Sequence, residues 1–287
     1  MTTFLSILLA ILIFGCIIAI HEFGHFIAAK CNKIQVNEFS IGMGPKIFQF
    51  QKGETRYSLR LLPIGGFCSM EGEDAESQNE RAFDRKPVWR RMIVVLAGAF
   101  MNIVLGFVLL LVTTCSDPYL ISNTIHGFHE QATSNTCGLQ VGDTIVSLNG
   151  SHIFTITDLQ YKMNNEAGEP FTVVVERNGE KVRLENVTFL DEETHDWLDF
   201  SLEAREKTVW SVTTYAAKDT IATGKLIWMS LLELVSGKYG IQDLSGPVGT
   251  VEVISDAATV GETAAERISS VLHLTIFITV NVGIFNL

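Results

Sequence analysis

Three long apolar stretches divide the chain. Residues 1–20 contain no charged side chain, and the stretches 92–114 and 268–287 contain no Asp, Glu, Lys or Arg. A helix over about residues 4–29 would be about 39 Å long at 1.5 Å per residue, which is enough to cross the hydrocarbon core of a membrane. The pattern therefore predicts a polytopic α-helical membrane protein with three spans.

Two further segments leave alternatives open. A cleaved signal peptide is the other interpretation of the first stretch, but it needs a basic residue ahead of the apolar run, and no Lys or Arg precedes Lys30. Segment 212–235 is apolar but carries Lys218, Asp219, Lys225 and Glu233. It is typical of an amphipathic helix at the membrane surface, or equally of a helix packed on a soluble domain.

The charges between the spans predict an orientation. Segment 30–91 holds 11 Lys and Arg against 8 Asp and Glu, whereas segment 114–264 holds 9 against 22. Because Lys and Arg are retained on the cytoplasmic side, we expect 30–91 to be cytoplasmic and 114–264 external. The net charge of -11 argues against a nucleic-acid partner.

Composition limits the remaining classes. Hydrophobic residues make up 47% of the chain and charged residues 18%, which excludes a disordered chain. The five cysteines are widely spaced and give neither a disulfide framework nor a CxxC zinc site. At most, Cys115 and Cys137 pair on an oxidising side of the membrane.

The first span ends in the most informative motif of the sequence. His21, Glu22 and His25 form an HExxH pattern. On a helix, residues four apart lie on one face, so both imidazoles can reach one zinc ion while the Glu serves as general base. Charged and polar groups inside a span are costly and therefore indicate function. The alternative is that these polar residues only contact lipid headgroups where the helix ends at the membrane surface.

This motif and four other segments resemble the site-2 protease family, in particular its bacterial regulated-intramembrane-proteolysis metalloproteases of RseP type. The segments are FSIGMGP at 39–45, LPIGGF at 62–67, GPVG at 246–249 and NVGIFNL at 281–287. The resemblance runs along nearly the whole chain.

The resemblance implies a zinc cofactor held by His21 and His25, with Glu22 as the catalytic base. The family's third ligand is an Asp in a Leu-Asp-Gly motif, which we expect beyond Leu287. The chain would then be truncated at its C-terminus, and weak or inactive as it stands. His273 would be the first other residue to consider as a ligand.

The resemblance also implies substrates and a location. Asn281 and Asn286 would bind the backbone of an unwound substrate, or otherwise join helices in the bundle. The partners would be transmembrane proteins, of the anti-sigma-factor or remnant-signal-peptide type, and the lipid bilayer. The protein would lie in the bacterial inner membrane.

The regions outside the spans predict two β structures. Residues 46–51 and 55–62 flank a Lys-Gly-Glu turn and predict a hairpin within 34–68, which the resemblance places against the membrane. Segment 118–190 resembles a single PDZ domain. Its predicted strands are 145–148, 171–177 and 181–187, and its predicted helix is 158–165 with Thr155 or Thr157 as cap. The region also contains His126, His129, His152 and His195. His126 and His129 lie three residues apart and predict a pair of surface histidines, with metal binding as the alternative.

These predictions give one architecture. The site-2-protease-like core comprises 1–113, with spans at about 4–29 and 92–114. An α+β PDZ-like domain covers 118–190, a linker with the amphipathic segment covers 191–264, and the third span begins at 265. The predicted function is intramembrane zinc proteolysis. The alternatives are a membrane-anchored PDZ adaptor with an inactive zinc site, and a zinc protease whose active site faces water.

Overall fold

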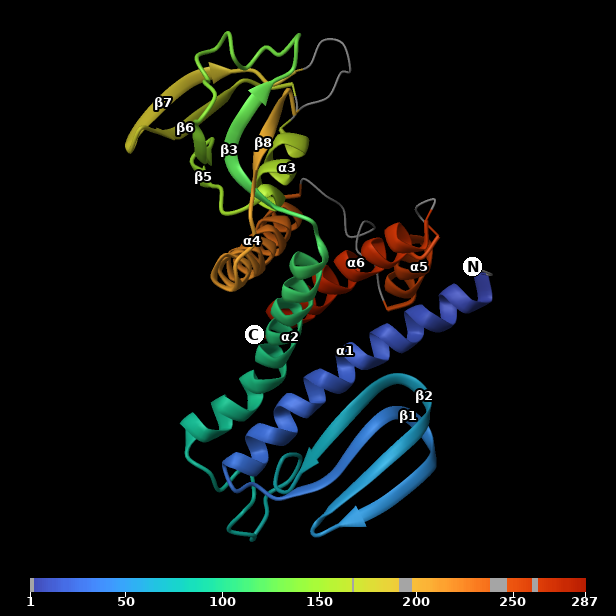
Figure 1. Ribbon diagram of the computed structural model, residues 1–287. Helices are drawn as coiled ribbons and strands as arrows, with labels where there is room; N and C mark the ends of the chain where they lie inside the picture. Colours follow the sequence, from blue (N-terminus) through green and yellow to red (C-terminus); the bar gives the residue numbers. More distant parts are fainter. Residues whose placement is uncertain (1–2, 167, 191–197, 238–246, 260–262) are drawn as a thin grey trace. The chain divides into compact units, whose positions relative to one another are not determined.

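The computed structural model describes residues 3–166, 168–190, 198–237, 247–259 and 263–287. It divides into two compact units, one of residues 1–109 and 231–287 and one of residues 110–230. Figure 1 shows the helices and strands of both units. His195 and part of the GPVG segment lie outside the described residues.

The first unit contains the helices that the apolar stretches predict. Among the described residues, three helices are long and apolar enough to span a membrane: α1 (Thr3–Cys31), α2 (Val88–Ser116) and α6 (Ala264–Phe285). α2 begins four residues before the predicted span and so includes Arg90 and Arg91. A shorter helix, α5 (Pro247–Ala257), contacts both α1 and α6.

The helix ends follow local chemistry. At the end of α1 the side chain of Asn32 donates to the carbonyl of Ala28 at 2.9 Å, and Lys33 adopts a positive φ of 56°. α6 begins at a capping box: Thr263 Oγ1 accepts from the Glu266 N–H, and the Glu266 carboxylate accepts from the Thr263 N–H. Such a box satisfies two of the free backbone donors of a helix start.

Small residues bring α2 and α6 together. A Cβ at Gly106 of α2 would lie 2.5 Å from Val280, and one at Gly283 of α6 would lie 3.0 Å from the carbonyl of Ala99. Close approach of this kind is what Gly permits between membrane helices. Buried Thr279 of α6 donates from Oγ1 to the main-chain carbonyl of Asn102 at 3.2 Å.

Strands β1 (Val36–Lys52) and β2 (Thr55–Met70) form an antiparallel pair beside α1. They are longer than predicted and curl, because residues 38–41 pair with both 56–59 and 66–69. Many of their apolar side chains are exposed, namely Ile41, Met43, Ile47, Phe48, Phe50, Leu59, Leu61 and Leu62. The pair therefore carries an apolar surface instead of burying a core of its own.

One ion cluster fixes the turn of this pair. The Glu54 carboxylate accepts from both terminal nitrogens of Arg81, at 2.6 and 2.7 Å, and from Lys30 Nζ at 2.7 Å. The hydrogen bonds from Arg81 and then Lys30 lower the pKa of Glu54 to about 2. The cluster ties the β1–β2 turn to the end of α1 and to the loop before α2.

The second unit is an antiparallel sheet with a helix against it. The strands are β3 (Leu120–Phe128), β4 (Thr144–Leu148), β5 (Ser151–His152), β6 (Phe171–Arg177), β7 (Glu180–Val187) and β8 (Phe200–Arg205). Their order is β7-β6-β4-β3-β8, with β5 paired to β4. The buried core comprises Ile125, Leu139, Ile145, Leu148, Ile153, Leu159, Met163, Phe171, Val173, Val175, Val187, Phe189 and Phe200.

The sequence located β4, β6 and β7 within one residue but missed β3 and β8. Asn178 and Gly179, between β6 and β7, both have positive φ, as a tight hairpin turn requires. β8 pairs with β3 and buries Phe200 in the core, so the sheet continues past residue 190. The boundary at 190 was therefore too early for the sheet.

Helix α4 (Val209–Val235) packs on this unit through polar contacts. Thr155 precedes α3 (Ile156–Asn165) but makes no side-chain cap; its hydroxyl instead donates to Asp219 of α4 at 2.6 Å. Lys225 of α4 donates to buried Asp158 at 2.8 Å. The helix thus packs on a domain, and its location at the membrane surface stays a prediction.

The cysteines form no disulfide. All five are free, including Cys115 and Cys137, so the pairing that the sequence allowed for these two is absent.

Candidate metal centre

α1 places His21 and His25 side by side on one face of the helix. Their ring centroids are 4.9 Å apart with the rings nearly perpendicular, and their Nε2 atoms are 3.2 Å apart. Two nitrogens at 2.0–2.1 Å from one zinc ion with tetrahedral geometry are about 3.3–3.4 Å apart. The two Nε2 atoms thus already have the separation of a shared zinc ion.

The second ring nitrogens are held by α2. His25 Nδ1 lies 2.7 Å from the carbonyl oxygen of Val94, which can only accept, so Nδ1 carries the proton and Nε2 keeps its lone pair. His21 Nδ1 lies 3.3 Å from the side-chain amide of Asn102. A partner on the second nitrogen is what orients metal-binding imidazoles in proteins.

Gly98 leaves room in front of both rings. A Cβ on Gly98 would lie 2.8 Å from His21 Nε2 and closer still to His25 Nε2. Any side chain at 98 would therefore occupy the space between α2 and the two ligand atoms. The donor set, its separation and this free space all fit a zinc ion.

Glu22 lies between the helix and the β1–β2 pair. It is half-buried, and a Cβ on Gly66 of β2 would lie 3.3 Å from Glu22 Cγ. Cys68, two residues along β2, is also close to the Glu22 carboxylate. The carboxylate that follows the first histidine is thus placed beside an extended strand.

The structure does not bring a third ligand to this pair. Among the described residues, no group of three or more His, Cys, Asp and Glu side chains could hold a metal ion. His273 is exposed, and its Nδ1 bonds to the Ser269 carbonyl of its own helix. Asn281 is half-buried, while Asn286 is exposed and bonds to Val282. The Asp beyond Leu287 stays a prediction.

Comparison with known proteins identifies the family. The model of peptidase family M50 matches residues 9–287. The chain belongs to peptidase family M50. This is the site-2 protease family that the HExxH motif and the segments around it resemble, and with its apolar helices it makes the chain an integral membrane protein.

Several M50 relatives span nearly the whole chain. A protein of Clostridium acetobutylicum, whose name gives it as a zinc metalloprotease, is 33% identical over 99% of this chain and 83% of its own length. A similarly named protein of Fusobacterium nucleatum is 34% identical over 99% of this chain and 84% of its own. The regulator of sigma-W protease RasP of Bacillus subtilis is 28% identical over 98% of this chain and 86% of its own.

The sequence did not predict the residues of α2 that surround His21 and His25. Val94, Gly98 and Asn102 are each four residues apart and therefore line one face of α2. Asn102 offered a signal, since it is the only amide side chain in the uncharged stretch 92–114. No sequence pattern indicates Val94 or Gly98. Val94 acts through its backbone carbonyl, and Gly98 acts by lacking a side chain.

The other histidines of the M50 chain stay apart from any metal group. His126 and His129 are exposed on the second unit, as predicted, and His152 is exposed as well. The His152 ring contacts Phe154 with centroids 4.5 Å apart. Among the described residues they join no cluster of metal-binding side chains.

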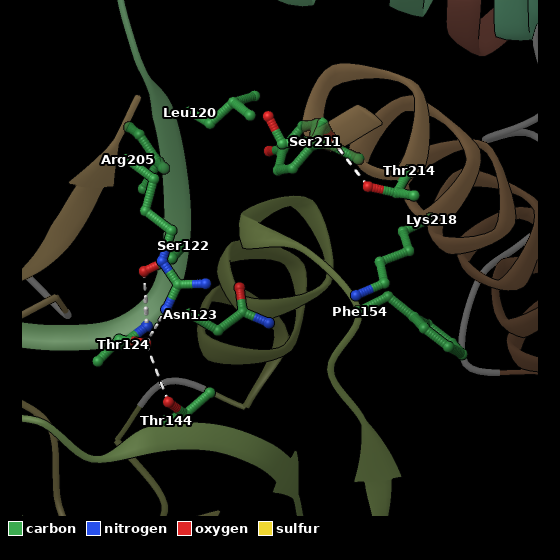
Figure 2. A pocket seen from close by; sticks show the side chains of 12 residues that line it. Leu120, Ser122, Asn123, Thr124, Thr144, Phe154, Arg205, Ser211, Thr214 and Lys218 are labelled. Atoms are coloured by element: carbon green, nitrogen blue, oxygen red, sulfur yellow. Dashed lines mark hydrogen bonds between the residues drawn. The ribbon is translucent and has the colours of Figure 1, made fainter. Parts of the chain in front are cut away.

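The second unit contains a pocket of about 230 Å³ between β3 and α4. Figure 2 shows Arg205 reaching across β3, where its guanidinium donates to Thr124 at 3.3 Å, and Lys218 extending from α4. Two cations among polar side chains favour an anionic group. The lining residues are Leu120, Ile121, Ser122, Asn123, Thr124, Thr144, Phe154, Arg205, Ser211, Thr214, Tyr215 and Lys218.

Proposed function

We propose that this M50 chain cleaves peptide bonds of membrane proteins at a zinc ion held by His21 and His25, with Glu22 as general base. The observation that carries the proposal is the 3.2 Å separation of the two Nε2 atoms, with both rings oriented from α2. The zinc metalloprotease names of the relatives support the same chemistry.

Each residue has a defined task in this reaction. Bound zinc supplies a Lewis acid that polarises the peptide carbonyl and lowers the pKa of water. Glu22 takes a proton from the attacking water and returns it to the amide nitrogen as the peptide bond breaks. The family resemblance implies an Asp as the third protein ligand.

The β1–β2 pair offers a binding edge for the substrate. A peptide bond in a helix is enclosed by its own hydrogen bonds, so the substrate must be extended at the cleavage site. Residues 66–69 pair with β1 on one side, and Gly66 and Cys68 adjoin Glu22. An extended substrate added along this edge would pass the base. The exposed apolar residues of the pair support placing it in contact with the membrane.

The substrates in this proposal are single membrane-spanning segments, of the anti-sigma-factor or remnant-signal-peptide type. The name of the Bacillus subtilis relative, a regulator of sigma-W, supports the first type. We place the protein in the bacterial inner membrane, with segment 30–91 in the cytoplasm. A reporter that works only outside the cytoplasm should then be active when fused at Gly150 and silent at Glu76. The reverse pattern would overturn this orientation.

The second unit is proposed to be a PDZ-like domain that binds peptide. On one side β3 pairs with β8 over its length, whereas on the other it pairs with β4 only at Thr124 and Thr144. β3 is thus an inner strand from Thr124 onward, but among the described strands its first residues, 120–123, pair only with β8. The open side of residues 120–123 can accept a peptide strand, and Lys218 and Arg205 lie in the pocket there. A peptide with a free C-terminal carboxylate should bind more tightly than its amidated form. Equal or absent binding would favour a domain that only excludes large substrates sterically.

The direct test of proteolysis uses Glu22→Gln in the full-length protein. This change keeps the shape of the side chain but removes the base, so cleavage of a membrane-spanning reporter substrate should fall by about 10²–10⁴-fold. Zinc content should stay the same. Near-normal cleavage by this variant would exclude the proposal, and an unchanged cellular effect would favour a membrane-anchored adaptor.

A further inference from the structure

The buried side chain of Asn102 shows an unbalanced hydrogen-bond pattern. Its Nδ2 lies 3.3 Å from His21 Nδ1, while its Oδ1 is buried with no hydrogen-bond partner. A buried amide oxygen without a donor costs free energy. The two ends of an Asn amide are assigned from the hydrogen bonds that they make, so both orientations of the side chain have to be compared.

The chemistry of His21 decides between the orientations. A neutral imidazole has one N–H donor and one lone pair. If Nε2 gives its lone pair to zinc, Nδ1 carries the proton and needs an acceptor. Oδ1 of Asn102 is such an acceptor, and a turn of the amide by 180° brings it to the position 3.3 Å from Nδ1. The Nδ2 group cannot accept.

We propose that Asn102 is the positioning residue of His21: its Oδ1 accepts the Nδ1–H and so directs the Nε2 lone pair at the metal. This inference rests on the proposed function. On the other ligand, the carbonyl of Val94 does the same for His25 at 2.7 Å. Two residues of α2 thus orient the two ligands: Val94 orients His25 through its backbone carbonyl, and Asn102 orients His21 through its side chain.

α6 fixes Asn102 in this role. Thr279 donates to the main-chain carbonyl of Asn102, and both residues are fully buried. Gly106 and Gly283 allow the two helices to approach closely at this level. The backbone of Asn102 is therefore held against α6, and only its side-chain amide can rotate.

The test measures the affinity for Zn²⁺ in detergent-solubilised full-length protein, by competition with a chromophoric chelator. Asn102→Leu keeps the bulk but has no acceptor, and we expect about 10–100-fold weaker binding, the usual loss for such partners. Asn102→Asp keeps an acceptor and should retain most of the wild-type affinity. The visible spectrum of bound Co²⁺ should change in the Leu variant and stay wild-type-like in the Asp variant.

Two controls separate the possible failures. Thr275→Val removes a buried hydroxyl of α6 that bonds only within its own helix, to Val271, and it should leave the affinity unchanged. Thermal unfolding of each zinc-free variant checks that it folds. If His21→Ala binds zinc as the wild type does, the proposed metal site itself is wrong.

If His21→Ala loses zinc while Asn102→Leu binds as tightly as the wild type, only the role of Asn102 is excluded. Equal weakening in Asn102→Leu and Asn102→Asp would also exclude it, because an acceptor would then make no difference.

Discussion

The two units of the molecule differ most in the large apolar side chains that they expose. In the second unit the buried core is apolar, and a charge inside it, Asp143, is matched by Arg177 at 2.7 Å. In the first unit large apolar side chains such as Phe48, Leu61 and Phe100 are exposed. Its fully buried residues include polar ones such as Asn102, Thr279 and Ser6.

This difference teaches how to find function in each unit. Where water is the solvent, a buried polar group is usually a structural partner of another group. Where lipid is the solvent, apolar residues face outward at no cost, so the polar groups turned inward mark the site. In the first unit those groups are the HExxH residues and the α2 residues that hold them.

The largest effect should come from Gly98→Ala. A Cβ at this position would lie within 2.8 Å of His21 Nε2 and would fill the space that the metal needs. We expect zinc binding and proteolysis to be lost below detection, although helix propensity favours Ala over Gly. Metal analysis of the purified protein checks this. As a control, Gly127→Ala in β3 of the second unit, where the nearest atom to the added Cβ would be Ser201 Oγ at 3.5 Å, should keep its zinc.

A smaller effect is expected on the free energy of unfolding when a buried leucine and an exposed leucine are each replaced by alanine. Leu148 is fully buried in the second unit, whereas Leu61 is 58% exposed in the first. Leu148→Ala should lower the free energy of unfolding by about 2–5 kcal/mol. Leu61→Ala should change it by less than about 0.5 kcal/mol. Unfolding in detergent followed by circular dichroism compares the two, and equal losses would remove the distinction between the units.

The smallest effect concerns Glu54 at the turn of the β1–β2 pair. Its pKa is lowered from 4.5 to about 2, so its hydrogen bonds stabilise the fold fully above pH 4.5 and lose this contribution as the pH falls toward 2. Because the partners are partly exposed, Glu54→Gln should cost less than about 1 kcal/mol at pH 7. The difference from the wild type should shrink in acid. A difference that persists at pH 2 would assign the effect to another group.

The sequence predicts what is local and misses what depends on tertiary contact. His21 and His25 were found because their spacing on one helix is enough to place them together. Gly98 and Asn102 were missed because their role depends on how α2 packs on α1. Thr155 was expected to cap α3, but the contact with Asp219 of α4 draws its hydroxyl away. Strands β3 and β8 pair although they lie about eighty residues apart in the sequence, and no local sequence pattern predicts such a pairing.

X-ray absorption at the zinc edge of the full-length protein tests the central claim most directly. With His21 and His25 as ligands, the spectrum should show two imidazoles at about 2.0–2.1 Å, at one zinc per chain. The signal should persist in Glu22→Gln and disappear in His21→Ala and His25→Ala. A spectrum of two imidazoles that survives the loss of either histidine would contradict the account, because zinc would then be bound elsewhere.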